Sequence, residues 1–110
     1  MSDDARIPTY LWVEAEMRRL SIAGIGVYVR AKGDKMGGIV LQKIADMKGQ
    51  SRLLIQQRNL NGVLVWMNAL AEEVMPERDA DSYIERAIAR DPDLWVIEIE
   101  DPSFQAQISN

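Results

Sequence analysis

A helical repeat of apolar residues is the first clear pattern in the chain. Its members recur at intervals of three and four positions, and they are Tyr10, Val13, Met17 and Leu20. This spacing places them on one face of an α-helix. Pro8 is tolerated at the start of a helix and Thr9 can cap one, while Gly24 and Gly26 follow the last apolar member. We therefore predict a helix over residues 9–22.

The period of the apolar residues changes to two over residues 26–32. Because successive side chains of a strand point to opposite faces, this predicts a half-buried strand with Tyr28, Arg30 and Lys32 on one face. A glycine-rich segment separates it from a second strand, predicted over residues 39–44. The short connection predicts that the two strands pair as a hairpin.

Two further strands flank the strongest turn signal of the chain. Residues 59–62 read Asn-Leu-Asn-Gly, and an Asn-Gly pair tolerates the positive φ that tight hairpin turns need. Alternating side chains predict strands over residues 52–57 and 63–67, which this turn joins as a hairpin.

A second helix is predicted in the last third of the chain. Residues 69–75 can form a short helical turn, which Pro76 ends. Ser82 and Glu85 have the spacing of a capping box, so a helix is predicted over residues 82–90.

The final strand is predicted over residues 94–100, after Asp91 leaves helical geometry ahead of Pro92. Its first residues, Leu-Trp-Val-Ile, are apolar on both faces, which favours a position inside a sheet. Residues 102–110 are polar and patternless, and they are predicted to be a flexible tail.

These elements predict a single α+β domain over residues 1–110, with an ordered core at about residues 7–101. Their order is α-β-β-β-β-α-β. Strands joined by short turns pair antiparallel, whereas the last strand arrives through a helix and can pair parallel. The predicted architecture is therefore a mostly antiparallel, mixed five-stranded sheet with two helices.

Composition and charge narrow the classes of partner. The 110 residues are 47% hydrophobic and 27% charged, as in folded globular proteins. A net charge of −4, from 17 acidic and 13 basic residues, opposes general attraction to nucleic acid and to anionic membranes. No apolar run approaches the length of a membrane-spanning helix, and the start, Met-Ser-Asp-Asp, is acidic where a secretory signal would be basic. The sequence therefore predicts a cytoplasmic protein.

Cysteine and histidine are both absent from the sequence. Their absence excludes disulfides, thiolate nucleophiles, Cys/His zinc sites and the one side chain that titrates near neutral pH without perturbation. Acid–base chemistry would fall to Asp, Glu, Lys or Tyr with shifted pKa values, and carboxylates can still hold a hard metal such as magnesium. We expect no cofactor.

Carboxylates gather near the end of the chain, where a metal site competes with ordinary structural roles. Asp91 and Asp93 can present a metal ion or form a tight turn, and the turn is favoured. Glu98 and Glu100 leave the same face of the last strand, where they can bind a hard cation.

Pairing with basic residues on another strand is the favoured alternative for Glu98 and Glu100. Arg30 and Lys32 share a face of the first predicted strand, and cross-strand pairs of opposite charge are common stabilisers of sheets.

The same basic residues, with Tyr28, resemble in composition the aromatic and basic sheet surfaces that bind RNA, although the acidic total opposes this role. Trp95 most simply anchors the core or an interface. The candidate binding residues are Tyr28, Arg30, Lys32, Trp95, Glu98 and Glu100.

Several sequence motifs, distributed over nearly the whole chain, occur together in this protein. They are Trp12, the pair Arg18-Arg19, the turn Gly33-Asp34 with Gly37-Gly38, Trp66, and residues 91–101, which read Asp-Pro-Asp-Leu-Trp-Val-Ile-Glu-Ile-Glu-Asp. In this combination the chain resembles a small alphaproteobacterial family of uncharacterised proteins, domain of unknown function 1491. The resemblance implies a bacterial cytoplasmic protein and implies no activity or catalytic residue.

No complete catalytic set is present in the sequence. It therefore favours a non-enzymatic interaction or adaptor protein that buries sheet surface against a second copy or a protein partner. A divalent-metal-assisted hydrolase using Asp91, Asp93, Glu98 or Glu100 is the alternative. A nucleic-acid-binding adaptor is the third hypothesis.

Overall fold

The computed structural model describes residues 7–109, and the predicted features of residues 1–6 and of Asn110 lie outside this part. Its elements are α1 (Thr9–Ile22), β1 (Gly26–Ala31), β2 (Val40–Ala45), β3 (Gln50–Arg58), β4 (Leu64–Asn68), β5 (Met75–Pro76), α2 (Glu77–Arg90) and β6 (Trp95–Glu100). The predicted α+β class and element order are confirmed, with the very short β5 as an additional strand. Within the described residues, no helix has the length and apolar character needed to cross a bilayer.

The strands form one mixed sheet in the order β1-β6-β2-β3-β4, and β5 pairs with the start of β3. β6 is parallel to β2, whereas β1–β6, β2–β3 and β3–β4 are antiparallel. The predicted interior position of the last strand is confirmed. The predicted hairpin of the first two strands is wrong, because β6 lies between them and buries both of its apolar faces there.

The hairpin of β3 and β4 is confirmed. Asn59 donates its backbone N–H to the Val63 carbonyl at 2.9 Å, and its side-chain oxygen accepts from the N–H groups of Asn61 and Val63. Gly62 has a φ of +79°, a backbone conformation that would be strained for a residue with a side chain. The Asn-Leu-Asn-Gly sequence therefore fixes this turn as the pattern predicts.

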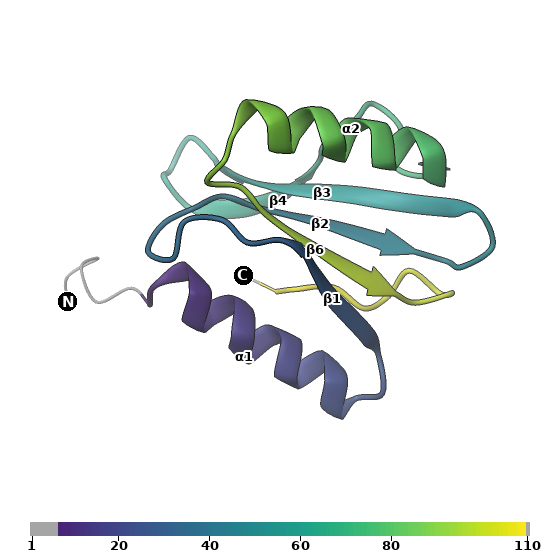
Figure 1. The fold of residues 1–110 in the computed structure, drawn as a ribbon, viewed down its shortest axis with the longest axis horizontal. Helices are drawn as coiled ribbons and strands as arrows, with labels where there is room; N and C mark the ends of the chain where they lie inside the picture. The colour runs from purple at the N-terminus through teal and green to yellow at the C-terminus, as the bar shows by residue number, and fades with distance from the viewer. Residues whose placement is uncertain (1–6, 110) are drawn as a thin grey trace.

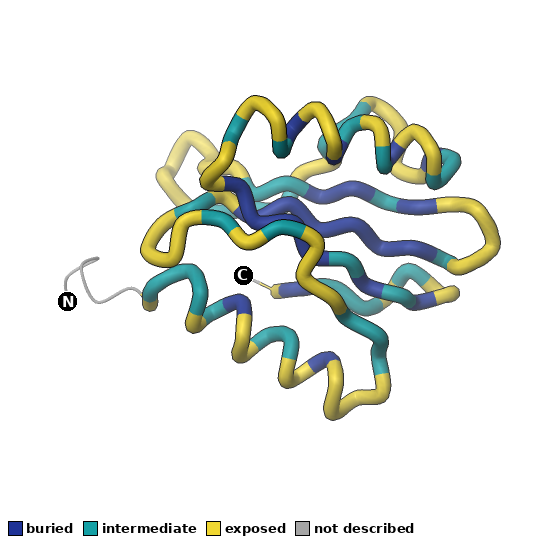
Figure 2. The backbone as a smooth tube through the Cα atoms, in the orientation of Figure 1, coloured by how far each residue is buried: buried dark blue, intermediate teal, exposed yellow. Residues whose placement is uncertain are grey.

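The two helices lie on opposite faces of the sheet (Figure 1). Alternation along β2 sends Val40 and Ile44 into the core beneath α1, and Leu41 into the core beneath α2. The central strands β2 and β6 are largely buried, whereas the turns and the outer faces of the helices are exposed (Figure 2).

Helix α2 begins at Glu77, earlier than predicted. Pro76 immediately precedes its first residue, in an extended conformation that suits a helix start. Glu77 and Asp79 lie in the first turn, where acids favour the helix dipole. Ser82 is inside the helix and does not cap it, so the predicted capping box is wrong, and residues 69–75 form bends and the start of β5 in place of a helical turn.

Residues 101–109, most of which the sequence pattern predicts to be a loose tail, return to the α1 side of the sheet. The Asp101 carboxylate accepts N–H groups from Ser103, Gln105 and Ala106, with the Ala106 bond as the main cause of its lowered pKa. The side chain of Gln42 exchanges two hydrogen bonds with the Ile108 backbone at 3.1 and 2.8 Å, and Ile108 is fully buried. Phe104 and Ala106 also pack against the core beneath α1, and Ser109 donates two hydrogen bonds to Glu16. Apolar burial and hydrogen bonds to α1 and β2 therefore anchor this segment.

Candidate functional site

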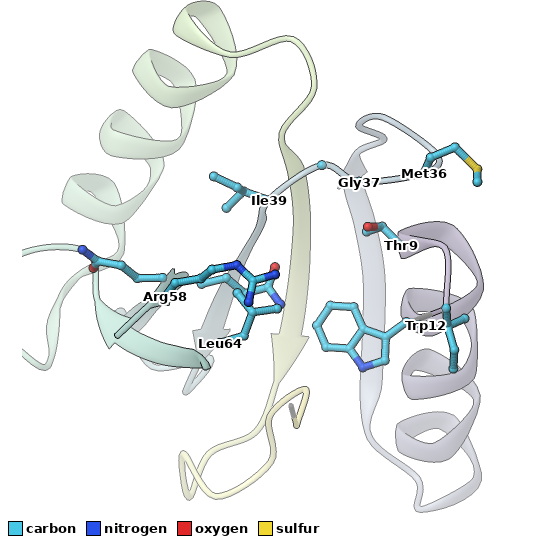
Figure 3. Close-up of a pocket in the computed structure, with 11 residues that line it drawn as sticks. Thr9, Trp12, Met36, Gly37, Ile39, Arg58 and Leu64 are labelled. Carbon is cyan, nitrogen blue, oxygen red and sulfur yellow. The ribbon is translucent and has the colours of Figure 1, made fainter. Parts of the chain in front are cut away.

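A groove of about 460 Å³ opens on the α1 side of the sheet, between the start of α1, the loop before β2, and the hairpin of β3 and β4 (Figure 3). Apolar side chains and glycine backbone provide most of its wall, with a few polar side chains. The lining residues are Ile7, Thr9, Trp12, Met36, Gly37, Gly38, Ile39, Gln56, Gln57, Arg58 and Leu64.

The groove exists because α1 does not extend over the whole sheet. The helix contacts β1, at the opposite edge from β4, and the segment ending at Ile108 packs beside it. The ends of β3 and β4 next to the turn are therefore left without a helix above them. Three of the lining side chains are apolar and exposed: Ile7, Met36 and Ile39.

Two tryptophans connect the groove to the core. The Trp12 and Trp66 rings are stacked, with centroids 6.3 Å apart and an interplanar angle of 21°. Trp12 points from α1 toward the strands, where Leu64 and Arg58 lie opposite it (Figure 3). Trp12 does not belong to the apolar stripe of α1 that Tyr10, Val13, Met17 and Leu20 form. The contact explains its separate position, because its partner Trp66 lies on β4, at the opposite edge of the sheet from β1.

The polar groups of the lining are mainly hydrogen-bond donors. The Gln56 side-chain oxygen accepts the Val40 N–H at 3.0 Å, which leaves its amide NH₂ as the end available for other contacts. Arg58 donates to the Gly62 carbonyl through one nitrogen, and a guanidinium has four further N–H groups. None of the lining residues is acidic. The groove is thus locally positive in a chain of net charge −4.

One wall of the groove is built by the residues that suggest the family resemblance. The Asp93 carbonyl accepts the Asp34 N–H at 3.0 Å, and the Trp95 indole N–H donates to the Asp34 carbonyl at 2.7 Å. A Cβ on Gly33 or Gly38 would lie 2.1 Å from the Asp93 carbonyl oxygen. The glycine turn and the Asp-Pro-Asp-Leu-Trp sequence therefore form one packed unit that holds the loop before β2 in place.

Beneath α2, a buried lysine on β2 and an arginine on β1 pair with carboxylates of the helix. Lys43 on β2 has only 4% of its side chain exposed, and its Nζ lies 2.8 Å from carboxylate oxygens of Glu77 and Asp81. Arg30 lies 2.9 Å from both Asp81 and Glu98. We call these five residues the Lys43 cluster.

Ion pairing in the Lys43 cluster sets the direction of the pKa shifts of Asp81 and Lys43. Burial would raise the pKa of Asp81, but the hydrogen bonds from Lys43 and Arg30 outweigh burial and lower it. Burial would likewise lower the pKa of Lys43, and its two carboxylate partners raise it instead. All five groups are satisfied by one another, which is the arrangement of a structural network.

Comparison with known proteins places the chain in a family. A family model described as "Protein of unknown function (DUF1491)" matches residues 7–109. The chain belongs to the DUF1491 family. No functionally curated protein matches it.

Solved structures of DUF1491 proteins have the same fold. A crystal structure of a family member from Caulobacter crescentus CB15 is 38% identical, with a TM-score of 0.79 over 88% of this chain and 90% of that one. An NMR structure of a family protein from the same organism, also 38% identical, gives a TM-score of 0.75 over 86% of each chain. A solution structure of an A. tumefaciens protein, 24% identical with a TM-score of 0.70 over 86% of each chain, shares the fold.

In this DUF1491 protein, the favoured pairing of Arg30 with Glu98 is present at 2.9 Å. The Tyr28 hydroxyl donates to Glu100 at 3.3 Å, and Lys32 lies exposed just after β1. Trp95 is 4% exposed. Four of the six candidate binding residues therefore bond to one another in pairs, and Trp95 is part of the core.

The carboxylates proposed for a metal-assisted hydrolase do not converge. The Asp91 carboxylate accepts the Asp93 N–H at 3.0 Å, which is the turn geometry favoured from the sequence. Glu98 faces Arg30, and Glu100 faces Tyr28. Residues 7–109 contain no group of three acidic residues placed to hold a metal ion.

The groove itself was not predicted from the sequence. Its lining comes from α1, the loop before β2 and the hairpin of β3 and β4, and no single segment carries a pattern of its own. The exposed apolar residues near the glycine turn and the hairpin turn were the signal available, together with Trp12 lying off the helical stripe.

Proposed function

We propose that this DUF1491 protein is a non-enzymatic, cytoplasmic interaction protein that binds a protein partner through the groove. The observation that carries the proposal is the uncovered end of β3 and β4, where the lining of a cavity of about 460 Å³ includes the exposed apolar residues Ile7, Met36 and Ile39. Exposed apolar surface around a concave site is typical of surfaces that bind partners.

Two other hypotheses have less support. The carboxylates of a hydrolase are engaged in a turn, an ion pair and a hydrogen bond to tyrosine. Arg30, the centre of the basic strip proposed for nucleic acid, faces three carboxylates at 2.9 to 3.9 Å. A guanidinium surrounded in this way has little charge left for phosphates.

Site-specific photo-cross-linking tests the proposal. A photoreactive residue replaces Met36, which is 66% exposed and lines the groove, or Ile22, which is 80% exposed at the far end of α1. Both are exposed apolar positions. Met36 lies beside the start of α1, where its carbonyl accepts the Thr9 N–H, and Ile22 is the last residue of the helix. The length of α1, about 20 Å, therefore separates them. In an alphaproteobacterial extract, we expect a discrete protein adduct from position 36 only.

Competition by the unlabelled protein separates specific adducts from random ones. Unlabelled wild type should abolish the adduct, whereas unlabelled Leu64→Asp should not, because the new charge lies in the groove wall. Equal adducts from positions 36 and 22, or none from either, would remove the groove from consideration as the binding surface.

A further inference from the structure

The two edges of the sheet differ in how they are protected. β1 carries a bulge between Val29 and Ala31. Arg30, at the bulge, pairs with Asp81 and Glu98 within the Lys43 cluster. Bulges and charges on edge strands prevent further strands from pairing. β4 reads Leu-Val-Trp-Met-Asn, without a charge, a proline or a bulge in its register.

The register of β3 and β4 shows which backbone groups point away from the sheet. Hydrogen bonds join Asn59 to Val63 and Ala69 to Leu53 at the two ends of the ladder. Bonded and non-bonded pairs alternate along an antiparallel ladder. The N–H and C=O groups of Val65 and Met67 therefore point toward β3.

The alternate residues of β4 are Leu64, Trp66 and Asn68, and their N–H and C=O groups point outward. No other strand among residues 7–109 pairs with that side of β4. A strand added there would form its backbone hydrogen bonds with these three residues.

The side chains of the same residues face the groove side of the sheet. Leu64 lines the groove, and Trp66 stacks on Trp12. Residues directly opposite one another on adjacent strands project from the same face. Side chains of an added strand opposite Leu64 and Trp66 would therefore project on the groove side.

Charge favours an acidic residue in such a strand. Arg58 pairs with Leu64 in the register and is the one charged residue of the lining. Gln56, two residues earlier on the same face of β3, adds an amide donor beside it. A carboxylate is the side chain that accepts from a guanidinium and from amides together.

We propose that β4 accepts an extended, acid-bearing segment of a partner protein as a further strand of the sheet, with an apolar side chain of that segment in the groove. The inference rests on the proposed function and specifies the form of its partner. Backbone pairing would provide affinity, and the groove with Arg58 would provide selectivity.

Selection from a random octapeptide display library on the immobilised protein provides the probe. We expect selected peptides to share β-forming residues, an apolar anchor and at least one acid. A peptide synthesised from the selection is then methylated at one backbone nitrogen at a time. Methylation at alternate positions, those facing β4, should weaken binding by about tenfold or more, and at the intervening positions by less than about threefold.

Matched arginine variants test the charge. Arg58→Gln should lower the affinity for the selected peptide by about tenfold. Arg18→Gln, on the exposed side of α1, should change that affinity by less than about twofold. The methylated peptides leave the protein unchanged, so they decide the outcome even if an arginine variant folds poorly.

Several results would overturn the inference: no peptide selected, equal tolerance of methylation at every position, or affinity independent of Arg58. A concentration-dependent dimer that Asn68→Pro dissolves would show that a second copy occupies the edge, and would also overturn it. A cross-link specific to position 36 with no peptide selected would overturn the added strand while leaving the groove as a binding surface.

Discussion

Removal of the acidic partners of Lys43 should destabilise the protein more than removal of Lys43 itself. The Lys43 side chain is 4% exposed, with Glu77 and Asp81 at 2.8 Å. Leaving a buried charge without its partner costs about 3–5 kcal/mol, whereas replacing buried ions with apolar groups can be neutral. The asymmetry follows from desolvation, because the ammonium group stays buried when its partners are gone.

The structure sets the size of each effect. In Asp81→Asn, Glu77 still accepts from Lys43, and the Asp81 side chain is 37% exposed, so we expect a loss of about 2 kcal/mol in the free energy of unfolding. In the double variant Glu77→Gln/Asp81→Asn, we expect about 4 kcal/mol. Lys43→Met leaves two partly exposed carboxylates, one of them still paired with Arg30, and should cost less than about 1 kcal/mol.

Urea unfolding at pH 7, followed by tryptophan fluorescence, measures these differences at constant m value. Glu85→Gln is the matched control, because Glu85 is on the same helix, 75% exposed and 3.9 Å from Arg30; it should change stability by less than about 0.5 kcal/mol. A Lys43→Met variant as unstable as the double variant would refute the argument, since replacing the buried ammonium with an apolar group would then cost as much as leaving it without its partners.

Three further predictions concern pH, the carboxyl-terminal segment and the glycine turn. The pKa values of Asp81 and Asp101 are lowered in the folded state, so their contribution is complete above the unfolded pKa of about 4 and is lost as pH falls through the folded values; a urea midpoint that rises between pH 5 and pH 3 would contradict this. Ile108→Ala should cost about 2–4 kcal/mol in the same assay, because Ile108 is fully buried, and a loss below about 0.5 kcal/mol would mean that the segment does not pack there. Gly38→Ala places a Cβ 2.1 Å from a backbone oxygen and should cost about 2–3 kcal/mol, whereas at Gly37 the nearest atom is 4.0 Å away and the change should be tolerated; equal stabilities would show that the loop does not pack as described.

The elements predicted accurately are those whose signal is local. Residues 9–22 form α1 with the predicted limits, because its apolar spacing, its proline and its glycines all lie within or next to the helix. The turn at residues 59–62 is specified by asparagine and glycine alone. The pairing of Arg30 with Glu98 was also predicted, because alternation along each strand indicates which face the side chain projects from.

The features that were missed depend on residues far apart in the chain. β1 and β2 do not pair because β6, which follows more than fifty residues later, occupies the place between them. From the sequence, Pro76 is equally compatible with the end of one helix and with the position before the start of another. Its pairing with Gln50 of β3, as part of β5, distinguishes the two possibilities. Ile108 carries no pattern, although its burial holds residues 101–109 to the sheet. The groove was missed for the same reason, because three separate segments line it.

Amide hydrogen exchange along β4 tests the central claim, that this DUF1491 protein binds its partner at the groove and the neighbouring edge. In the free protein, the outward-facing amides of Leu64, Trp66 and Asn68 should exchange rapidly, and those of Val65 and Met67 slowly. With the selected peptide bound, we expect the outward-facing amides to become protected. Unchanged exchange along β4, with protection appearing at β1 or at α2, would contradict the claim.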